Sequence, residues 1–123
     1  MKRILVVDDQ PEVLELLAEI LDPEDYLTQT ASSGRQSLER IRRLKPDLII
    51  LDWMMPGEMD GLDVLRALKG DQELKGIPVL MLSAKGQDAD ITTGLDAGAD
   101  YFFTKPFSPI ELLNKVEQIV GVN

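Results

Sequence analysis

The sequence contains no cysteine and no histidine. The first absence rules out disulfides, iron–sulfur clusters and thiol nucleophiles. Together the two absences rule out the usual zinc sites and histidine acid–base catalysis. Any metal must therefore bind to oxygen atoms, and Mg²⁺ or Mn²⁺ is the expected ion. A chain without cysteine is also typical of the cytoplasm.

Basic residues are scarce as well. The 13 Lys and Arg face 22 Asp and Glu, which gives a net charge of −9 at pH 7. This excess repels phosphate backbones and anionic lipids, so we expect no direct nucleic-acid binding and no membrane contact. The start MKRILVVDDQ is not a signal peptide, because two aspartates interrupt its short apolar run, and no stretch is long enough to span a bilayer. We therefore expect a cytoplasmic protein.

What the sequence does contain fits one folded domain. Its 123 residues are 44% hydrophobic and 28% charged, which is ordinary for a soluble fold and too short for two domains. Strands are predicted at residues 4–7, 26–31, 48–51, 79–82 and 101–103, and helices at residues 12–21, 37–44, 62–68, 87–97 and 110–120. This alternation predicts an α/β fold, a doubly wound five-stranded parallel sheet of order 2-1-3-4-5, flavodoxin-like (βα)5.

Chemically active side chains follow four of the predicted strands, at the edge where open parallel sheets carry their sites. They are Asp8 and Asp9, Asp52, Ser83, and Lys105, which precedes Pro106. Three neighbouring carboxylates repel one another, and a hard divalent cation relieves that repulsion. A metal, an anionic nucleophile, a cation and a hydroxyl are the groups needed to place a phosphoryl group on an aspartate.

Each of these residues also has a plainer explanation when it is taken alone. Asp8 or Asp9 can cap the helix that follows, and Ser83 can cap the helix that follows it. Asp52 can be a loop acid in the turn that leads to Pro56 and Gly57. Lys105 can be a structural ion-pair partner of the acids. Its bond to Pro106 favours an extended backbone and is a candidate for the cis form.

The segments ILVVDDQ, LIILDWMMPG, MDG, VLMLSAK and GADYFFTKPF, in this order, resemble the receiver domain of two-component response regulators. The resemblance covers essentially the whole chain, so it implies that residues 1–123 form one receiver domain. It implies that Asp52 accepts a phosphoryl group from a sensor histidine kinase or a histidine phosphotransfer protein. Such a protein is a signalling switch and not an enzyme, since it catalyses only its own phosphotransfer and dephosphorylation.

The resemblance also implies roles for the other residues of this edge. Asp9 and Asp52 match direct ligands of Mg²⁺ (or Mn²⁺), Asp8 matches a ligand acting mostly through water, and the Met54 backbone carbonyl completes the set. Lys105 matches the residue that contacts a phosphoryl oxygen.

A switch is implied by two further positions. Ser83 matches the switch hydroxyl and Phe102 the switch aromatic, so that phosphorylation would reshape the face of the fourth helix, fifth strand and fifth helix. That face would act on a downstream protein target or a fused effector domain. The resemblance also allows a dimer that forms on phosphorylation. Met54 and Lys85 match positions that tune phosphoryl lifetime, and the bulk of Met54 predicts slow dephosphorylation.

The sequence differs from the receiver pattern in one loop, and three other functions compete with that of a phosphorylated receiver. The loop at residues 55–61 carries one residue more than the family pattern M-P-x-M-D-G. A degenerate receiver that acts only by docking would not need the complete set of acids, serine and lysine. A flavodoxin-like cofactor-binding module needs a phosphate-cradling first loop, which Asp-Asp-Gln-Pro is not. An aspartate-nucleophile phosphatase typically carries D-x-D and a cap domain.

Overall fold

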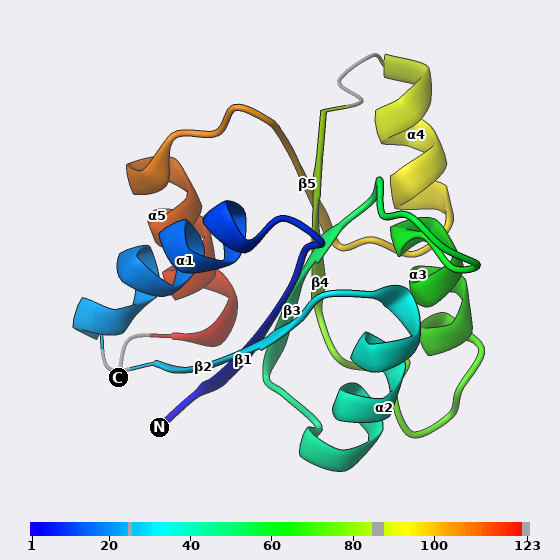
Figure 1. Cartoon of the computed structure of the whole chain (residues 1–123), viewed down its shortest axis with the longest axis horizontal. Helices are drawn as coiled ribbons and strands as arrows, with labels where there is room; N and C mark the ends of the chain where they lie inside the picture. Colours follow the sequence, from blue (N-terminus) through cyan, green and yellow to red (C-terminus); the bar gives the residue numbers. More distant parts are fainter. Residues whose placement is uncertain (25, 85–87, 122–123) are drawn as a thin grey trace.

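The computed structural model describes residues 1–24, 26–84 and 88–121. Five strands and five helices alternate along the chain, with one short 3₁₀ turn (Figure 1). In chain order the elements are β1 (Arg3–Val7), α1 (Pro11–Leu21), η1 (Asp22–Glu24), β2 (Leu27–Ala31), α2 (Gly34–Leu44), β3 (Leu48–Asp52), α3 (Gly61–Lys69), β4 (Val79–Ser83), α4 (Asp88–Asp96), β5 (Tyr101–Thr104) and α5 (Pro109–Val120). In this described part of the chain, no helix has the length and apolar character to cross a membrane.

The strands form one parallel sheet in the order β2-β1-β3-β4-β5, which confirms the predicted topology. β2 and β5 are therefore the two edge strands. Figure 1 shows α1 and α5 together on one side of the sheet and α2, α3 and α4 on the other. The chain moves outward from β1 to the edge strand β2 and then returns past β1 to β3, β4 and β5. This reversal of direction places helices on both faces and a crevice at the carboxyl ends of β1 and β3.

Each face of the sheet carries its own hydrophobic core, because alternate residues of a strand point to opposite faces. On β3, Ile49 and Leu51 pack toward α2 and α3, and Leu48 and Ile50 pack toward α1 and α5. All four side chains are fully buried. This two-sided burial explains why the central strands are continuous apolar runs in the sequence. Each such side chain contributes about 1.5–3 kcal/mol when it leaves water.

The helix ends show which local signals the chain uses. Pro11 occupies the first turn of α1, as predicted, and Gln10 is the N-cap residue without a side-chain cap. Neither Asp8 nor Asp9 therefore serves as the cap that the sequence allowed. Ser83 does not cap α4 either, because that helix begins only at Asp88.

Candidate functional site

The carboxyl ends of β1, β3 and β5 bring two acids and a lysine into direct contact. The Lys105 Nζ donates to Asp8 Oδ2 at 2.9 Å and to Asp52 Oδ1 at 3.0 Å. Asp8 and Asp52 are almost fully buried, at 0% and 4% exposure. The convergence predicted from strand ends is thus present, with Lys105 bridging carboxylates from two different strands.

The surrounding backbone holds this arrangement in place. Asp8 Oδ1 accepts a hydrogen bond from the Gln10 backbone N–H at 2.9 Å, which fixes the carboxylate at the start of the first loop. The Lys105 backbone N–H donates to the Ser83 carbonyl at 2.8 Å, which continues the pairing of β5 with β4. The Lys105–Pro106 bond is cis.

Burial and like charge shift the protonation of this cluster. The pKa of Asp52 is raised to about 6: burial is the largest cause, the charge of Asp8 acts in the same direction, and the hydrogen bond from Lys105 opposes both effects. For Lys105, burial lowers the pKa, but the hydrogen bonds to Asp8 and Asp52 outweigh it and leave the pKa raised. At neutral pH the lysine is therefore charged and Asp52 is mostly ionised.

Asp8, Asp9 and Asp52 can each place one carboxylate oxygen within 4.8 Å of the others. Lys105 bonds to Asp8 and Asp52, and Asp9 is half-buried beside them. Three carboxylates and one ammonium leave two negative charges, and an all-oxygen set of this kind suits a hard divalent cation. The cluster therefore fits a metal of the magnesium type.

A hollow of about 200 Å³ opens directly on these side chains. Its lining residues are Asp9, Gln10, Asp52, Met54, Ala84 and Lys105. The Met54 side chain is 55% exposed at its rim, whereas Met55 is buried in the core. The hollow has room for a small anion such as a phosphoryl group next to Asp52.

The two predicted switch residues, Ser83 and Phe102, lie on the neighbouring strands β4 and β5. Ser83 is fully buried at the end of β4 and lies one residue before Ala84, which lines the hollow. Phe102 is half-buried on β5, and its ring meets the Trp53 ring edge-on with centroids 6.2 Å apart. Trp53 directly follows Asp52, so the aromatic contact begins one residue from the acid. Lys85 lies outside the described residues.

Gly61 packs against the backbone of Asp52, a role that the sequence did not reveal. A Cβ built on Gly61 would lie 2.0 Å from the Asp52 carbonyl oxygen and 2.7 Å from Trp53 Cα. The Gly61 backbone N–H donates to the Trp53 carbonyl at 2.8 Å. The first turn of α3 therefore packs on the backbone of Asp52, at a distance that admits glycine alone.

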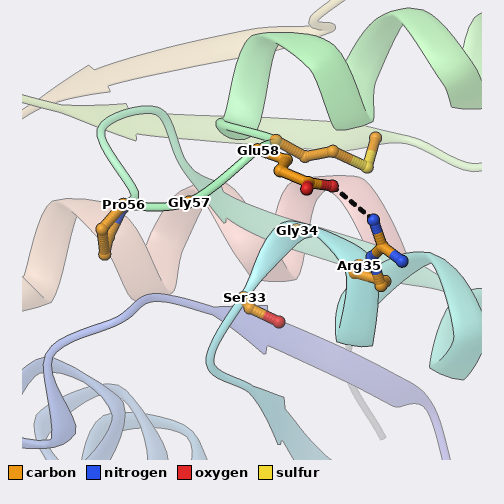
Figure 2. A pocket seen from close by; sticks show the side chains of 7 residues that line it. Ser33, Gly34, Arg35, Pro56, Gly57 and Glu58 are labelled. Atoms are coloured by element: carbon orange, nitrogen blue, oxygen red, sulfur yellow. Dashed lines mark hydrogen bonds and ion pairs between the residues drawn. The ribbon is translucent and has the colours of Figure 1, made fainter.

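The loop after β3 accommodates its extra residue at Gly57, which does not line the hollow beside the acids. Gly57 takes a left-handed conformation with φ of 101°, and nothing lies within 4 Å of its Cβ position. Asp60 then starts α3 with a capping box shared with Asp63. Figure 2 shows Glu58 of this loop paired with Arg35 of α2. The Arg35 Nη2 and Glu58 Oε2 atoms are 2.5 Å apart, and both residues line a hollow of about 330 Å³. Both side chains are mostly exposed, so this ion pair contributes little to stability.

The fold and the bridged acids together define a class of protein. The response regulator receiver domain family matches residues 4–117 of the chain. The chain belongs to this family, and its function is that of a receiver domain of two-component signalling, as the sequence predicted.

Several known proteins resemble the chain closely. It is 45% identical to the DNA-binding response regulator MtrA of Mycolicibacterium smegmatis, over 94% of this chain and 49% of that protein. It is 41% identical to the phosphate regulon transcriptional regulatory protein PhoB of Pseudomonas aeruginosa, over 97% of this chain and 52% of that protein. The structure of the Francisella response regulator 1452 receiver domain matches it with a TM-score of 0.91 at 32% identity, covering 98% of this chain and 97% of the other.

These relatives correct one expectation. The chain spans about half the length of the curated relatives that it matches, and those relatives are DNA-binding or transcriptional regulators. The expectation of no direct nucleic acid, drawn from the net charge of −9, is therefore wrong. The charge of a receiver does not decide what a regulator that includes a receiver binds.

Proposed function

We propose that Asp52 is the phosphoacceptor of a receiver domain that takes its phosphoryl group from a phosphohistidine. The observation that carries this proposal is the Lys105 bridge to Asp8 and Asp52 beside a small open hollow. A carboxylate oxygen of Asp52 attacks phosphorus, the P–N bond to the imidazole breaks, and the imidazole takes its proton from water. The nucleophile needs no base, because Asp52 is mostly ionised at neutral pH.

Lys105 lies within reach of both the acceptor and its neighbour. As the phosphoryl group arrives, its ammonium can shift from the two carboxylates to an oxygen of the transferring group, where negative charge gathers. Asp8, Asp9, Asp52 and the Met54 carbonyl would hold Mg²⁺ or Mn²⁺. The bound ion would supply further positive charge to the phosphoryl oxygens. The chain thus promotes its own phosphorylation and dephosphorylation.

Ser83 and Phe102 form the response to phosphorylation in this proposal. The phosphoryl group adds a charge of about −2 and new acceptor oxygens next to β4. The Ser83 hydroxyl moves toward those oxygens, and Phe102 changes its packing against Trp53 and α4. A nearly complete switch requires about 5.5 kcal/mol of preference for the phosphorylated state.

Met54 governs the lifetime of the phosphorylated state, together with Lys85. The half-exposed Met54 side chain at the rim of the hollow obstructs a water molecule that approaches phosphorus in line. We expect slow loss of phosphate in the wild type and a shorter half-life in Met54→Ala.

The whole regulator is inferred from the relatives. Residues 1–123 act as its receiver, in the cytoplasm, between a histidine kinase and control of transcription. DNA binding by such a regulator would be performed by a separate part, as the names and the lengths of the relatives suggest.

Treatment with acetyl phosphate and Mg²⁺ followed by mass spectrometry tests the assignment. Wild-type protein should gain one phosphoryl group, and Asp52→Asn should gain none. Asp96→Asn, which changes an exposed aspartate on α4, should behave as wild type. Uptake by Asp52→Asn at the wild-type level would refute the site. A wild type that takes up no phosphate would instead favour a degenerate receiver that acts by docking.

A further inference from the structure

The β2 edge of the sheet carries opposite charges on its two faces. On the α1 side, a hollow of about 340 Å³ is lined by Ala18, Glu19, Asp22, Tyr26, Leu27 and Thr28. On the α2 side, a hollow of about 260 Å³ is lined by Gln29, Thr30, Arg40, Arg43 and Leu44. We call these the acidic flank and the basic flank. Both border the edge strand β2. Figure 1 shows α1 and α2 on opposite faces of the sheet beside this strand.

The charges of these flanks are largely available to a partner. Glu19, Asp22 and Arg43 are exposed, and no salt bridge pairs them within the described residues. Leu27 adds an apolar side chain with 42% exposure at the start of the edge strand.

The mixture of signs limits what can bind at this edge. A uniformly negative partner such as duplex DNA would meet Glu19 and Asp22 as soon as it approached Arg43. A uniformly basic partner would be attracted to the acidic flank but repelled by Arg43 of the basic flank. Only a surface that carries both signs in the opposite order satisfies both flanks.

A second copy of this chain provides such a surface. A two-fold axis parallel to β2 exchanges the two faces of the sheet while it keeps the strand direction. The acidic flank of each copy then faces the basic flank of the other, and the same contact forms twice, as in other symmetric dimers.

A rotation about this axis leaves every residue at the same position along the direction of β2. The charged residues of the two flanks must therefore lie at the same level along the strand, and they do. Arg3 is level with Leu27 in the sheet, and its guanidinium donates to the Leu44 carbonyl, which places the end of α2 at the start of β2. The acidic flank also lies at the start of β2, since its lining includes Leu27 and Thr28. Arg43 of one copy therefore comes level with Glu19 and Asp22 of the other.

We propose that two copies of this chain associate along their β2 edges, with the acidic flank of each against the basic flank of the other. The contact is made by side chains and not by extending the sheet, because the Arg40 guanidinium donates to the Thr30 carbonyl and covers that point of the edge. β2 lies at the opposite edge of the sheet from β5. The association therefore leaves α4 and β5 free and does not require phosphorylation.

Sedimentation velocity of the full chain in about 0.15 M NaCl tests this proposal, since flank charges then act over a screening length of about 8 Å. We expect a monomer–dimer equilibrium with a dissociation constant of about 0.1–1 mM, typical of a small contact. Arg43→Glu should weaken dimerisation at least about tenfold, because like charges then face each other twice. Arg42→Glu is the matched control, since this exposed neighbour does not line the basic flank, and it should dimerise as wild type.

A charge exchange makes the test specific. Glu19→Arg alone should also lose dimerisation, and an equimolar mixture of Arg43→Glu and Glu19→Arg should regain it, because each variant then supplies the sign that the other lacks. Phosphate uptake from acetyl phosphate should be unchanged in every variant, which shows that each one folds. A wild type that stays monomeric at about 1 mM would overturn the proposal. So would equal effects of the two arginine variants, a mixture that fails to dimerise, or duplex DNA binding that Arg43→Glu abolishes.

Discussion

Gly61→Ala should disturb the proposed acceptor site and the fold together. The new Cβ would lie 2.0 Å from the Asp52 carbonyl oxygen, whereas real Cβ contacts essentially never fall below 3.0 Å. The first turn of α3 and the end of β3 must therefore separate by at least about 1 Å, which is the difference between these two values. Both sides of the contact are backbone, so no side chain can turn away to relieve it.

The size of the effect follows from that displacement. Overpacking a well-packed site usually costs about 1–3 kcal/mol, and we expect the upper end here because two segments of backbone must move. A shift of about 1 Å at the nucleophile lowers a reaction rate by on the order of 100-fold. We therefore expect a loss of about 3 kcal/mol in unfolding free energy. We also expect the rate of phosphate uptake by Asp52 to fall on the order of 100-fold.

Urea unfolding followed by the fluorescence of Trp53, the single tryptophan, measures the first quantity. Timed mass spectrometry with acetyl phosphate and Mg²⁺ measures the second. Gly76→Ala is the matched control, because nothing lies within 4 Å of the Cβ position of Gly76, and its stability should change by less than about 0.5 kcal/mol. If Gly61→Ala is as stable and as reactive as Gly76→Ala, the contact between α3 and the acceptor backbone does not have the role assigned to it.

Three other changes have expected outcomes. Because the folded-state pKa of Asp52 is raised from 3.8 to about 6, its ionisation destabilises the fold increasingly as the pH rises through this interval. Asp52→Asn should therefore add up to about 3 kcal/mol to the unfolding free energy at pH 7 and almost nothing at pH 4, as urea titrations at both pH values would show. Lys105→Met leaves two buried carboxylates without their ammonium and should cost about 3 kcal/mol at pH 7, with partial recovery below pH 6 as Asp52 takes up a proton. Equal losses at pH 5 and pH 7 would argue against that explanation. Asp60→Ala removes the capping box of α3 and should lower the thermal midpoint by an amount equivalent to about 1 kcal/mol, measurable by calorimetry, whereas an unchanged midpoint would contradict the role of the cap.

The sequence predicted most of the fold because its signals are local and consistent. Apolar runs on strands buried from both sides read clearly, and each predicted central strand lies within a residue of the observed one. The edge strand β2 is less apolar, yet its place followed from the alternation. Lys105 could be placed beside Asp52 because parallel strands bring their carboxyl ends to the same edge of the sheet.

Other features depended on contacts between distant segments and could not be read. The start of α2 at Gly34 was missed because glycine is a poor helix former, although Ser33 caps it. The sequence did not show that Gly61 packs on the backbone of Asp52, since close approach leaves no local pattern. It also did not show which acids Lys105 would contact, and the lysine bonds to Asp8 and Asp52.

The separation of the core into two layers limits how far a change at β5 can spread. Phe102 packs with the layer that contains Trp53 and Met81, and the next residue, Phe103, packs with the layer of α1 and α5. A rotation of the Phe102 ring therefore loosens its own layer first, while the sheet backbone separates it from the other. Hydrogen exchange should then accelerate in α4 and leave the amides of α1 and α5 as slow as before. We therefore expect the layer of α1 and α5 to stay in place during the proposed switch, while Gly61 of α3 continues to hold the backbone of Asp52.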